Sequence, residues 1–251
     1  MSRIAVFDSG LGSLSIIKPI QKKIKTEIIY FADQDNFPYG TKSTSELRKI
    51  IKSTIRRLEE KFEPDLIVVA SNTPSLLLNL KKRSKILGVY PPLKDAAEKT
   101  ITNSIAILAT KSVVESKELQ NYIKKQVPKG IRVIKIDTSP LVELVESGAF
   151  LTRKEFCKKK ISSALKIIQD DRIDVVTLSS THLPFLLPML KKAFPDVTFL
   201  DPADLVAAKI AMFLKNKKPD IRKLKIFASG NTTSFQKKLQ KLGIKNKVFP
   251  L

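Results

Sequence analysis

Short runs of uninterrupted apolar residues alternate along this chain with longer stretches in which apolar residues recur every three or four positions. The short runs are typical of parallel strands covered on both faces, and the longer stretches are typical of amphipathic helices. The pattern predicts strands at residues 3–7, 27–31, 85–89, 105–108, 132–136, 198–200, 224–228 and 247–249. It predicts helices at residues 14–25, 45–61, 114–125, 141–147, 152–170, 203–215 and 235–242. We therefore expect an α/β fold built on parallel sheets.

One stretch of the chain occurs twice. In each copy an aspartate, Asp65 or Asp174, opens an apolar run, and a serine, Ser71 or Ser180, stands six residues later. A leucine-rich helical pattern follows in both copies and ends in a pair of lysines. Each copy therefore predicts a buried strand, a polar turn and a helix.

The polar turn of each copy is a candidate ligand site. A helix N-terminus offers free backbone N–H groups and a partial positive charge, so two of them can grip one carboxylate or phosphate. Serine is also a preferred N-cap residue, and the alternative is that Ser71 and Ser180 only cap the helices that follow them. The repeat alone leaves both interpretations open.

The repeat and the pair of prolines at 91–92 predict two domains. The first comprises residues 1–93 and 208–251, and the second comprises residues 94–207. Two similar parallel-sheet α/β domains with the same strand, turn and helix suggest a pseudo-two-fold arrangement with a ligand cleft between them. That arrangement would place one serine of the repeat on each side of the ligand.

Composition excludes several classes of protein. The only cysteine is Cys157, so no internal disulfide can form, and we expect this residue on a helix that partly faces the core. No cluster of cysteine and histidine has metal-ligand spacing, and no metal is expected. The first residues are typical of a strand rather than a signal sequence, and no stretch is apolar enough to cross a membrane. We expect a cytoplasmic protein.

The net charge of +22 is the unusual feature of the composition. A basic surface attracts phosphate backbones without sequence preference. Here the lysines are spread over nearly every predicted helix in short groups, such as 22–23 and 158–160, without the interleaved aromatic residues of a stacking platform. We interpret the charge as a solvated basic surface and keep nucleic-acid binding as a second hypothesis, which salt-dependent retention on DNA would test.

Polar residues also follow other predicted strands. Asp8 comes directly after the first strand, at the sheet edge where α/β proteins place functional groups, although it can equally cap the next helix. The glycine-containing turn after it lacks the spacing of a phosphate-binding loop. Tyr39 offers a hydroxyl from a turn, while Glu143 and Glu146 face either a cleft or water.

Taken together, these segments resemble those of glutamate racemases, of the cofactor-independent aspartate/glutamate racemase superfamily, over essentially the whole chain. The matching segments are residues 7–15, 30–33, 38–40, 71–73, 145–148, 180–182 and 201–203. The resemblance implies two α/β domains that hold a dicarboxylic amino acid without any cofactor. It also implies interconversion of L- and D-glutamate, in which one thiolate removes the α-proton and a second thiol returns a proton to the opposite face.

The resemblance further implies which residues form the site. Ser71 and Ser180 stand where the family has its two catalytic cysteines. The residues that assist those cysteines match Asp8, Glu146 and His182. The family positions that hold the substrate correspond to Ser9, Pro38, Tyr39, Gly40, Asn72, Thr73 and Thr181. Relatives are often dimers, so a homodimer is a further expectation.

The two serines do not fit the family's reaction. A free thiol titrates near pH 8.5 and its neighbours can lower that pKa, whereas a serine hydroxyl is far less acidic. A neutral hydroxyl is too weak a base to remove an α-proton efficiently, so efficient two-thiol racemisation is excluded.

Three explanations of the serines stay open. The chain is an engineered double variant that traps substrate, a natural relative that kept the pocket and lost the chemistry, or an enzyme with a slower or different reaction that uses Asp8, Glu146 or His182. Ser139, where relatives commonly have a further, non-catalytic cysteine, favours a natural origin.

Other functions compete with this interpretation. A serine hydrolase would need His182, the only histidine, and Asp8 to complete a triad with one of the serines. No G-x-S-x-G turn surrounds Ser71 or Ser180, which argues against that class. A non-catalytic protein that binds acidic amino acids is the stronger rival. Aspartate racemase-like activity is also open, although the resemblance to the glutamate-specific branch favours the longer acid.

Overall fold

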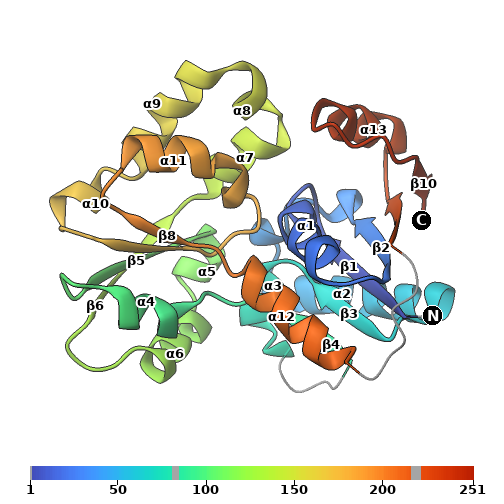
Figure 1. The fold of residues 1–251 in the computed structure, drawn as a ribbon, viewed down its shortest axis with the longest axis horizontal. Helices are drawn as coiled ribbons and strands as arrows, with labels where there is room; N and C mark the ends of the chain where they lie inside the picture. Colours follow the sequence, from blue (N-terminus) through green and yellow to red (C-terminus); the bar gives the residue numbers. More distant parts are fainter. Residues whose placement is uncertain (1, 81–84, 216–221) are drawn as a thin grey trace. The chain divides into compact units, whose positions relative to one another are not determined.

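The computed structural model of the chain describes residues 2–80, 85–215 and 222–251. The chain forms two compact units, Met1–Val89 with Ala203–Leu251, and Tyr90–Pro202. Each unit is built around one parallel β-sheet that carries helices (Figure 1). The predicted α/β fold with two parallel-sheet domains is therefore confirmed.

The sheet of the first unit has the strand order β10-β9-β2-β1-β3-β4, with every pair parallel. Its strands are β1 (Arg3–Asp8), β2 (Glu27–Ala32), β3 (Leu66–Val69), β4 (Ile86–Gly88), β9 (Lys223–Ala228) and β10 (Val248–Pro250). The central strands β2 and β3 are buried along their whole length. This explains their uninterrupted apolar runs, because helices cover both faces of the sheet.

Helices of the first unit divide between the two faces of this sheet. They are α1 (Ser13–Lys23), α2 (Thr44–Phe62), α3 (Asn72–Leu77), α12 (Ala203–Phe213) and α13 (Thr232–Lys241), with short 3-10 helices η1 (Gln34–Asn36) and η2 (Tyr39–Thr41). On one face, Leu47 and Ile51 of α2 pack with Phe7 and Phe31 in the hydrophobic core. Helices α1 and α12 pack together, and Phe235 of α13 makes an edge-on ring contact with Tyr30.

The second unit has the strand order β6-β5-β7-β8, again parallel throughout. Its strands are β5 (Ser104–Ala109), β6 (Arg132–Asp137), β7 (Val175–Leu178) and β8 (Thr198–Leu200). Its helices are α4 (Leu93–Lys99), α5 (Lys111–Val114), α6 (Lys117–Gln126), α7 (Ser139–Glu146), α8 (Ala149–Thr152), α9 (Lys154–Ala164), α10 (Ile167–Asp170), η4 (Leu183–Leu186) and α11 (Leu187–Ala193). Across the described parts of both units, no helix is long and apolar enough to cross a membrane.

The internal repeat corresponds to equivalent strands in the two sheets. Strand β3 lies beside β1 in the order β2-β1-β3-β4, and β7 lies beside β5 in the order β6-β5-β7-β8. The aspartate that opens each copy anchors the start of its strand. Asp65 accepts a hydrogen bond from the Arg3 backbone N–H at 2.9 Å, and Asp174 accepts one from the Ile101 backbone N–H at 2.6 Å.

Two of the helices predicted from the sequence have different bounds in the structure. The helix expected at 114–125 is present as α6, Lys117–Gln126, but it begins later than expected, because Ser116 separates it from α5 and caps it by accepting a hydrogen bond from the Leu119 N–H at 3.1 Å. The single long helix expected at 152–170 is wrong, since Arg153 and Leu165 leave helical geometry and separate α8, α9 and α10. Apolar residues keep their helical spacing across the helix boundaries at Ser116 and Arg153, so this spacing does not reveal where the helices end.

The helices expected in the two copies of the repeat are shorter than predicted. In the first copy α3 ends at Leu77, and the lysines that close that copy, Lys81 and Lys82, lie outside the described residues. In the second copy the turn leads into the 3-10 helix η4, and α11 starts only at Leu187. Of the two copies, the first begins an α-helix directly at its turn, and the second begins a 3-10 helix there.

A buried carboxylate connects three strands of the first sheet. Glu27 of β2 is 3 % exposed and forms ion pairs with Arg3 of β1 at 2.6 Å and Lys225 of β9 at 2.8 Å. Burial acts to raise the pKa of Glu27, but the hydrogen bonds from Lys225 and Arg3 outweigh it, so the pKa lies below its ordinary value of 4.5. The ionised carboxylate thus stabilises the pairing of these strands.

We predict that Glu27→Gln lowers the free energy of unfolding by about 1–3 kcal/mol at pH 7, because hydrogen bonds to a charged group are lost. A lowered pKa in the folded state contributes stability above the unfolded value of 4.5. The difference between the two proteins should therefore shrink as the pH falls below that value. Urea unfolding at pH 7 and pH 4 measures both effects.

The matched control is Glu60→Gln, which removes a carboxylate from an exposed ion pair with Arg56 at 2.6 Å. Exposed pairs contribute little, so this variant should change stability by less than about 0.5 kcal/mol. Equal effects of the two substitutions would contradict the assigned role of Glu27.

Candidate active site

The carboxyl edge of the first sheet brings several polar side chains together. Asp8 ends β1, Asp33 follows β2, and Ser71 follows β3. The backbone ladder continues beyond the strands, because Asp33 N–H donates to the Asp8 carbonyl at 2.8 Å and Ala70 N–H donates to the Phe7 carbonyl at 2.8 Å. Parallel strands thus place these residues at neighbouring positions of one edge, where α/β proteins bind ligands.

Asp33 is the centre of the hydrogen-bond network at this edge. Its side chain is buried and accepts hydrogen bonds from the hydroxyls of Tyr39 at 2.8 Å and Ser229 at 3.3 Å. It also accepts from the Asn36 amide at 2.8 Å and the Thr54 hydroxyl at 3.4 Å. The carboxylate therefore fixes the loop that carries Tyr39 against α2 and the end of β9.

Sequence reasoning did not place Asp33 among the site residues. The available signal was the same one that singled out Asp8, an aspartate directly after a buried strand. What the sequence could not show is that Thr54 and Ser229, far away along the chain, supply donors to it.

Tyr39 is a fully buried phenol beside two carboxylates. Burial, followed by the nearby charges of Asp33 and Asp8, raises the pKa of Tyr39 well above its ordinary value of 10.0. The hydroxyl therefore stays protonated at neutral pH and donates to Asp33. Asp8 is itself buried and accepts a hydrogen bond from the Ser9 backbone N–H at 2.7 Å.

The other predicted residues of the first unit lie on η2, α3 and the loops before them. Pro38, Tyr39 and Gly40 belong to or directly precede η2, which packs against α3. Helix α3 begins with Asn72 and Thr73, and both side chains are buried. The structure thus collects Asp8, Ser9, Pro38, Tyr39, Gly40, Ser71, Asn72 and Thr73 in one unit.

Ser71 does not cap α3, although its residue type would suit that role. Its side chain forms no capping hydrogen bond, while its carbonyl accepts one from the Ser75 hydroxyl at 2.6 Å. The amide of the neighbouring Asn72 is buried, and within the described part of the chain neither its nitrogen nor its oxygen has a hydrogen-bond partner. A buried amide without partners costs free energy unless a ligand or water satisfies it.

The remaining predicted residues lie in the second unit. Ser180, Thr181 and His182 follow β7, and all three side chains are buried. His182 Nε2 lies 2.8 Å from Glu146 Oε1, at the end of α7, and α7 packs against η4. A buried histidine paired with a carboxylate can hold and pass on a proton, which is the chemistry of a general acid or base.

The two serines of the repeat occupy equivalent positions. Ser179 N–H donates to the Leu108 carbonyl at 2.9 Å, which is the counterpart of the bond from Ala70 to Phe7. Ser71 and Ser180 are each the next residue, so each stands one position beyond the ladder that joins the central strand to its neighbour. The second sheet has no carboxylate at the position that Asp8 occupies in the first sheet, because Ala109 of β5 corresponds to Asp8 of β1.

Among the described residues, no group of three or more histidine, cysteine, aspartate or glutamate side chains has a geometry that could hold a metal ion. The fold and these residues define a class: an α/β protein whose two parallel sheets carry buried acid–base and hydroxyl groups at their carboxyl edges. Comparisons with known proteins identify the family within this class.

A model of the Asp/Glu/hydantoin racemase family matches residues 9–210. The glutamate racemase of Thermoanaerobacter pseudethanolicus is 30 % identical over 249 residues, which cover 95 % of this chain and 92 % of the relative. The crystal structure of glutamate racemase isoform RacE1 from Bacillus anthracis is 26 % identical, with a TM-score of 0.84 over 100 % of this chain and 97 % of that one. The chain belongs to the Asp/Glu/hydantoin racemase family.

We predict that Asp33→Asn lowers the pKa of Tyr39, because one of the two negative charges beside the phenol is removed. The pKa should nevertheless stay above 10.0, because burial is the largest cause of the shift. The measurement is a pH titration of the Tyr39 ring carbon by NMR. Asp35→Asn removes an exposed carboxylate from the same loop and should leave the titration unchanged. If the pKa of Tyr39 is the same in Asp33→Asn as in the native protein, the described contact between Tyr39 and Asp33 is contradicted.

Proposed function

We propose that this protein binds a small acidic amino acid, with glutamate as the preferred ligand, and that its capacity for racemisation is strongly impaired. In this proposal Ser71 and Ser180 take the positions of the family's two catalytic cysteines. Asp8, Glu146 and His182 are the remaining acid–base groups of the site. Ser9, Pro38, Tyr39, Gly40, Asn72, Thr73 and Thr181 contact the substrate.

The observation that carries the proposal is the equivalence of the two serines in a chain that belongs to a racemase family. Each serine stands one residue beyond equivalent backbone bonds of the two sheets. A racemase that uses two bases needs one acid–base side chain on each face of the α-carbon, and two equivalent positions can supply them. The Asn72 amide, which has no hydrogen-bond partner among the residues that the structure describes, supports a ligand at this position, since it offers two donors and an acceptor.

Impaired chemistry follows from the side chains that are present. Cys157 is the only cysteine of the sequence, and it is buried on α9, so no pair of thiols exists to carry the α-proton. A neutral hydroxyl is a poor general base at pH 7. The pair of His182 and Glu146 is the group best suited to any residual proton transfer, because imidazole titrates near neutral pH.

Two alternatives concern the same site. A non-catalytic protein that binds acidic amino acids would keep the substrate-binding residues and show no proton transfer. An aspartate racemase-like activity would differ in ligand length rather than in acid–base groups.

The first test is incubation with L-glutamate or L-aspartate in deuterated buffer, followed by proton NMR of the α-position. We expect binding of glutamate with α-proton exchange that is very slow or absent. Exchange at rates typical of an efficient enzyme would contradict the impaired chemistry. A failure of both acids to bind at millimolar concentration would contradict the proposed ligand class.

The second test restores the thiols with the double substitution Ser71→Cys and Ser180→Cys. General acid–base catalysis contributes about 10²–10⁴-fold, so we expect α-proton exchange to rise by a factor in that range. Ser139→Cys is the matched control, because it adds a thiol where the serine hydroxyl is bound to Asp137 at 2.6 Å. A double variant that binds glutamate but shows no more exchange than this control would refute the assignment of the two serines.

A further inference from the structure

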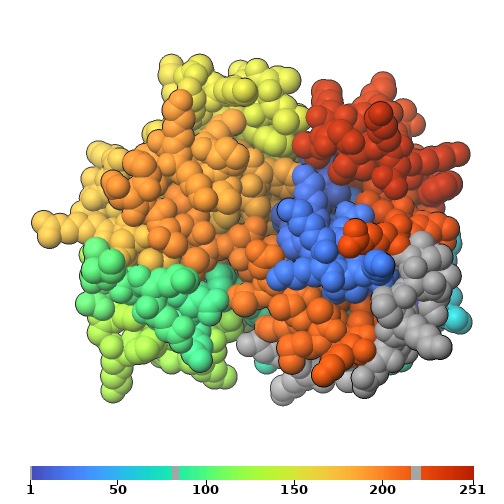
Figure 2. Space-filling view, in the orientation of Figure 1, coloured from blue at the N-terminus to red at the C-terminus, as the bar shows by residue number. Residues whose placement is uncertain are grey.

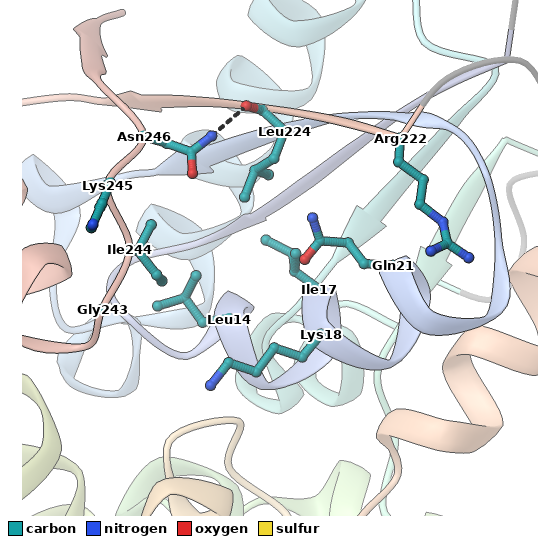
Figure 3. A pocket seen from close by; sticks show the side chains of 10 residues that line it. All are labelled: Leu14, Ile17, Lys18, Gln21, Arg222, Leu224, Gly243, Ile244, Lys245 and Asn246. Carbon is teal, nitrogen blue, oxygen red and sulfur yellow. Dashed lines mark hydrogen bonds between the residues drawn. The ribbon is translucent and has the colours of Figure 1, made fainter.

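A pocket of about 490 Å³ opens on the first unit, and none of its lining residues belongs to the candidate active site. It is formed by α1, the start of β9 and the loop after α13, as Figure 3 shows. Its lining consists of Leu14, Ile17, Lys18, Gln21, Arg222, Leu224, Gly243, Ile244, Lys245 and Asn246. Sites for small ligands typically enclose about 300–1,000 Å³, so the size suits a metabolite.

The lining combines an apolar centre with a cationic margin. Leu14, Ile17, Leu224 and Ile244 supply apolar side chains, and the Gln21 amide lies among them (Figure 3). Three exposed cations stand around this centre, Lys18, Arg222 and Lys245. The loop that forms one side is held in place, because the Asn246 amide donates to the Leu224 carbonyl at 2.9 Å.

The positive charge of this margin is not neutralised within the described part of the chain. Lys18, Arg222 and Lys245 form no ion pair there, whereas nearby Lys23 and Lys225 are paired with acidic residues. The sequence shows that the lining itself contributes no carboxylate. No aspartate or glutamate occurs at residues 9–26 or at residues 222–251, and these two segments supply the whole lining.

We propose that this pocket binds a small organic phosphate, that is, a molecule with a phosphate or diphosphate group next to an apolar or planar group. Unpaired cations match a multiply charged phosphate better than a single carboxylate, because each adds a favourable charge contact. The apolar centre would cover the uncharged part of the ligand. The Gln21 amide can donate to or accept from it.

The concave form of the site favours a small ligand over a nucleic-acid strand. Figure 2 shows the surface of α1, in blue, between that of α12 and the C-terminal segment that contains α13. A polymer backbone needs cations along an extended track, while here they surround one apolar centre. This site is separate from the one proposed for the acidic amino acid.

The test is calorimetric titration of the full-length protein with ADP, pyrophosphate and adenosine at about 0.15 M salt, where exposed charges farther than about 8 Å apart are screened. We expect one ADP per chain, with tighter binding than either pyrophosphate or adenosine, because only ADP offers both the charged and the planar part. Absence of ADP binding up to millimolar concentration would overturn the proposal.

A pair of charge-matched variants separates a pocket from a generally basic surface. The triple substitution Lys18→Ala, Arg222→Ala and Lys245→Ala should weaken ADP binding at least about tenfold, since three charge contacts are lost. The control triple is Lys22→Ala, Lys223→Ala and Lys241→Ala, which removes the same charge from neighbouring positions of the same segments. It should weaken binding less than about twofold.

Equal weakening by the two triple variants would show non-specific attraction and overturn the proposal. Competition by a short DNA duplex that displaces ADP from the native protein, with the same affinity for both triple variants, would equally overturn it in favour of a polymer. We expect all variants to fold, because every substituted side chain is exposed. Circular dichroism and thermal unfolding check this.

Discussion

The structure depends on one constraint: in each sheet, the strand of the internal repeat pairs in parallel with a central strand. It aligns β1 with β3 and β5 with β7, and in both sheets one further backbone bond extends the pairing past the strand. Because all strands of a parallel sheet end at the same edge, residues far apart in sequence are collected there. Asp8, Asp33 and Ser71 become neighbours only for this reason.

The sequence predicted the strands well because their signal is local. A continuous apolar run such as that of β3 marks a strand whose two faces are buried, and nothing elsewhere in the chain needs to be known. The helix breaks at Ser116 and Arg153 were not predictable in the same way, since apolar periodicity continues across them. The role of Asp33 was missed because it depends on donors from α2 and from beyond β9.

The predicted site residues lie at the carboxyl edges of two parallel sheets, in a chain that belongs to the Asp/Glu/hydantoin racemase family. The Tyr39 hydroxyl is paired with Asp33 and His182 with Glu146, whereas the buried Asn72 amide has no hydrogen-bond partner among the described residues. The basic residues that give the net charge of +22 differ in whether they are paired with a carboxylate. Around the pocket of the first unit, Lys18, Arg222 and Lys245 have no ion-pair partner among the described residues, whereas Lys225 of β9 is paired with Glu27.

The pairing of β2 with β9 has a consequence for how the chain acquires its structure during synthesis. The second unit is continuous, Tyr90–Pro202, so all of it is synthesised before β9. The first unit must wait, because β9 supplies the neighbour of β2, the Lys225 partner of Glu27 and, just beyond its end, the Ser229 hydroxyl on Asp33. In vectorial synthesis, where domains fold as units, the segment that starts first is therefore completed last, and Asp33 gains its full set of partners only when the C-terminal strands emerge.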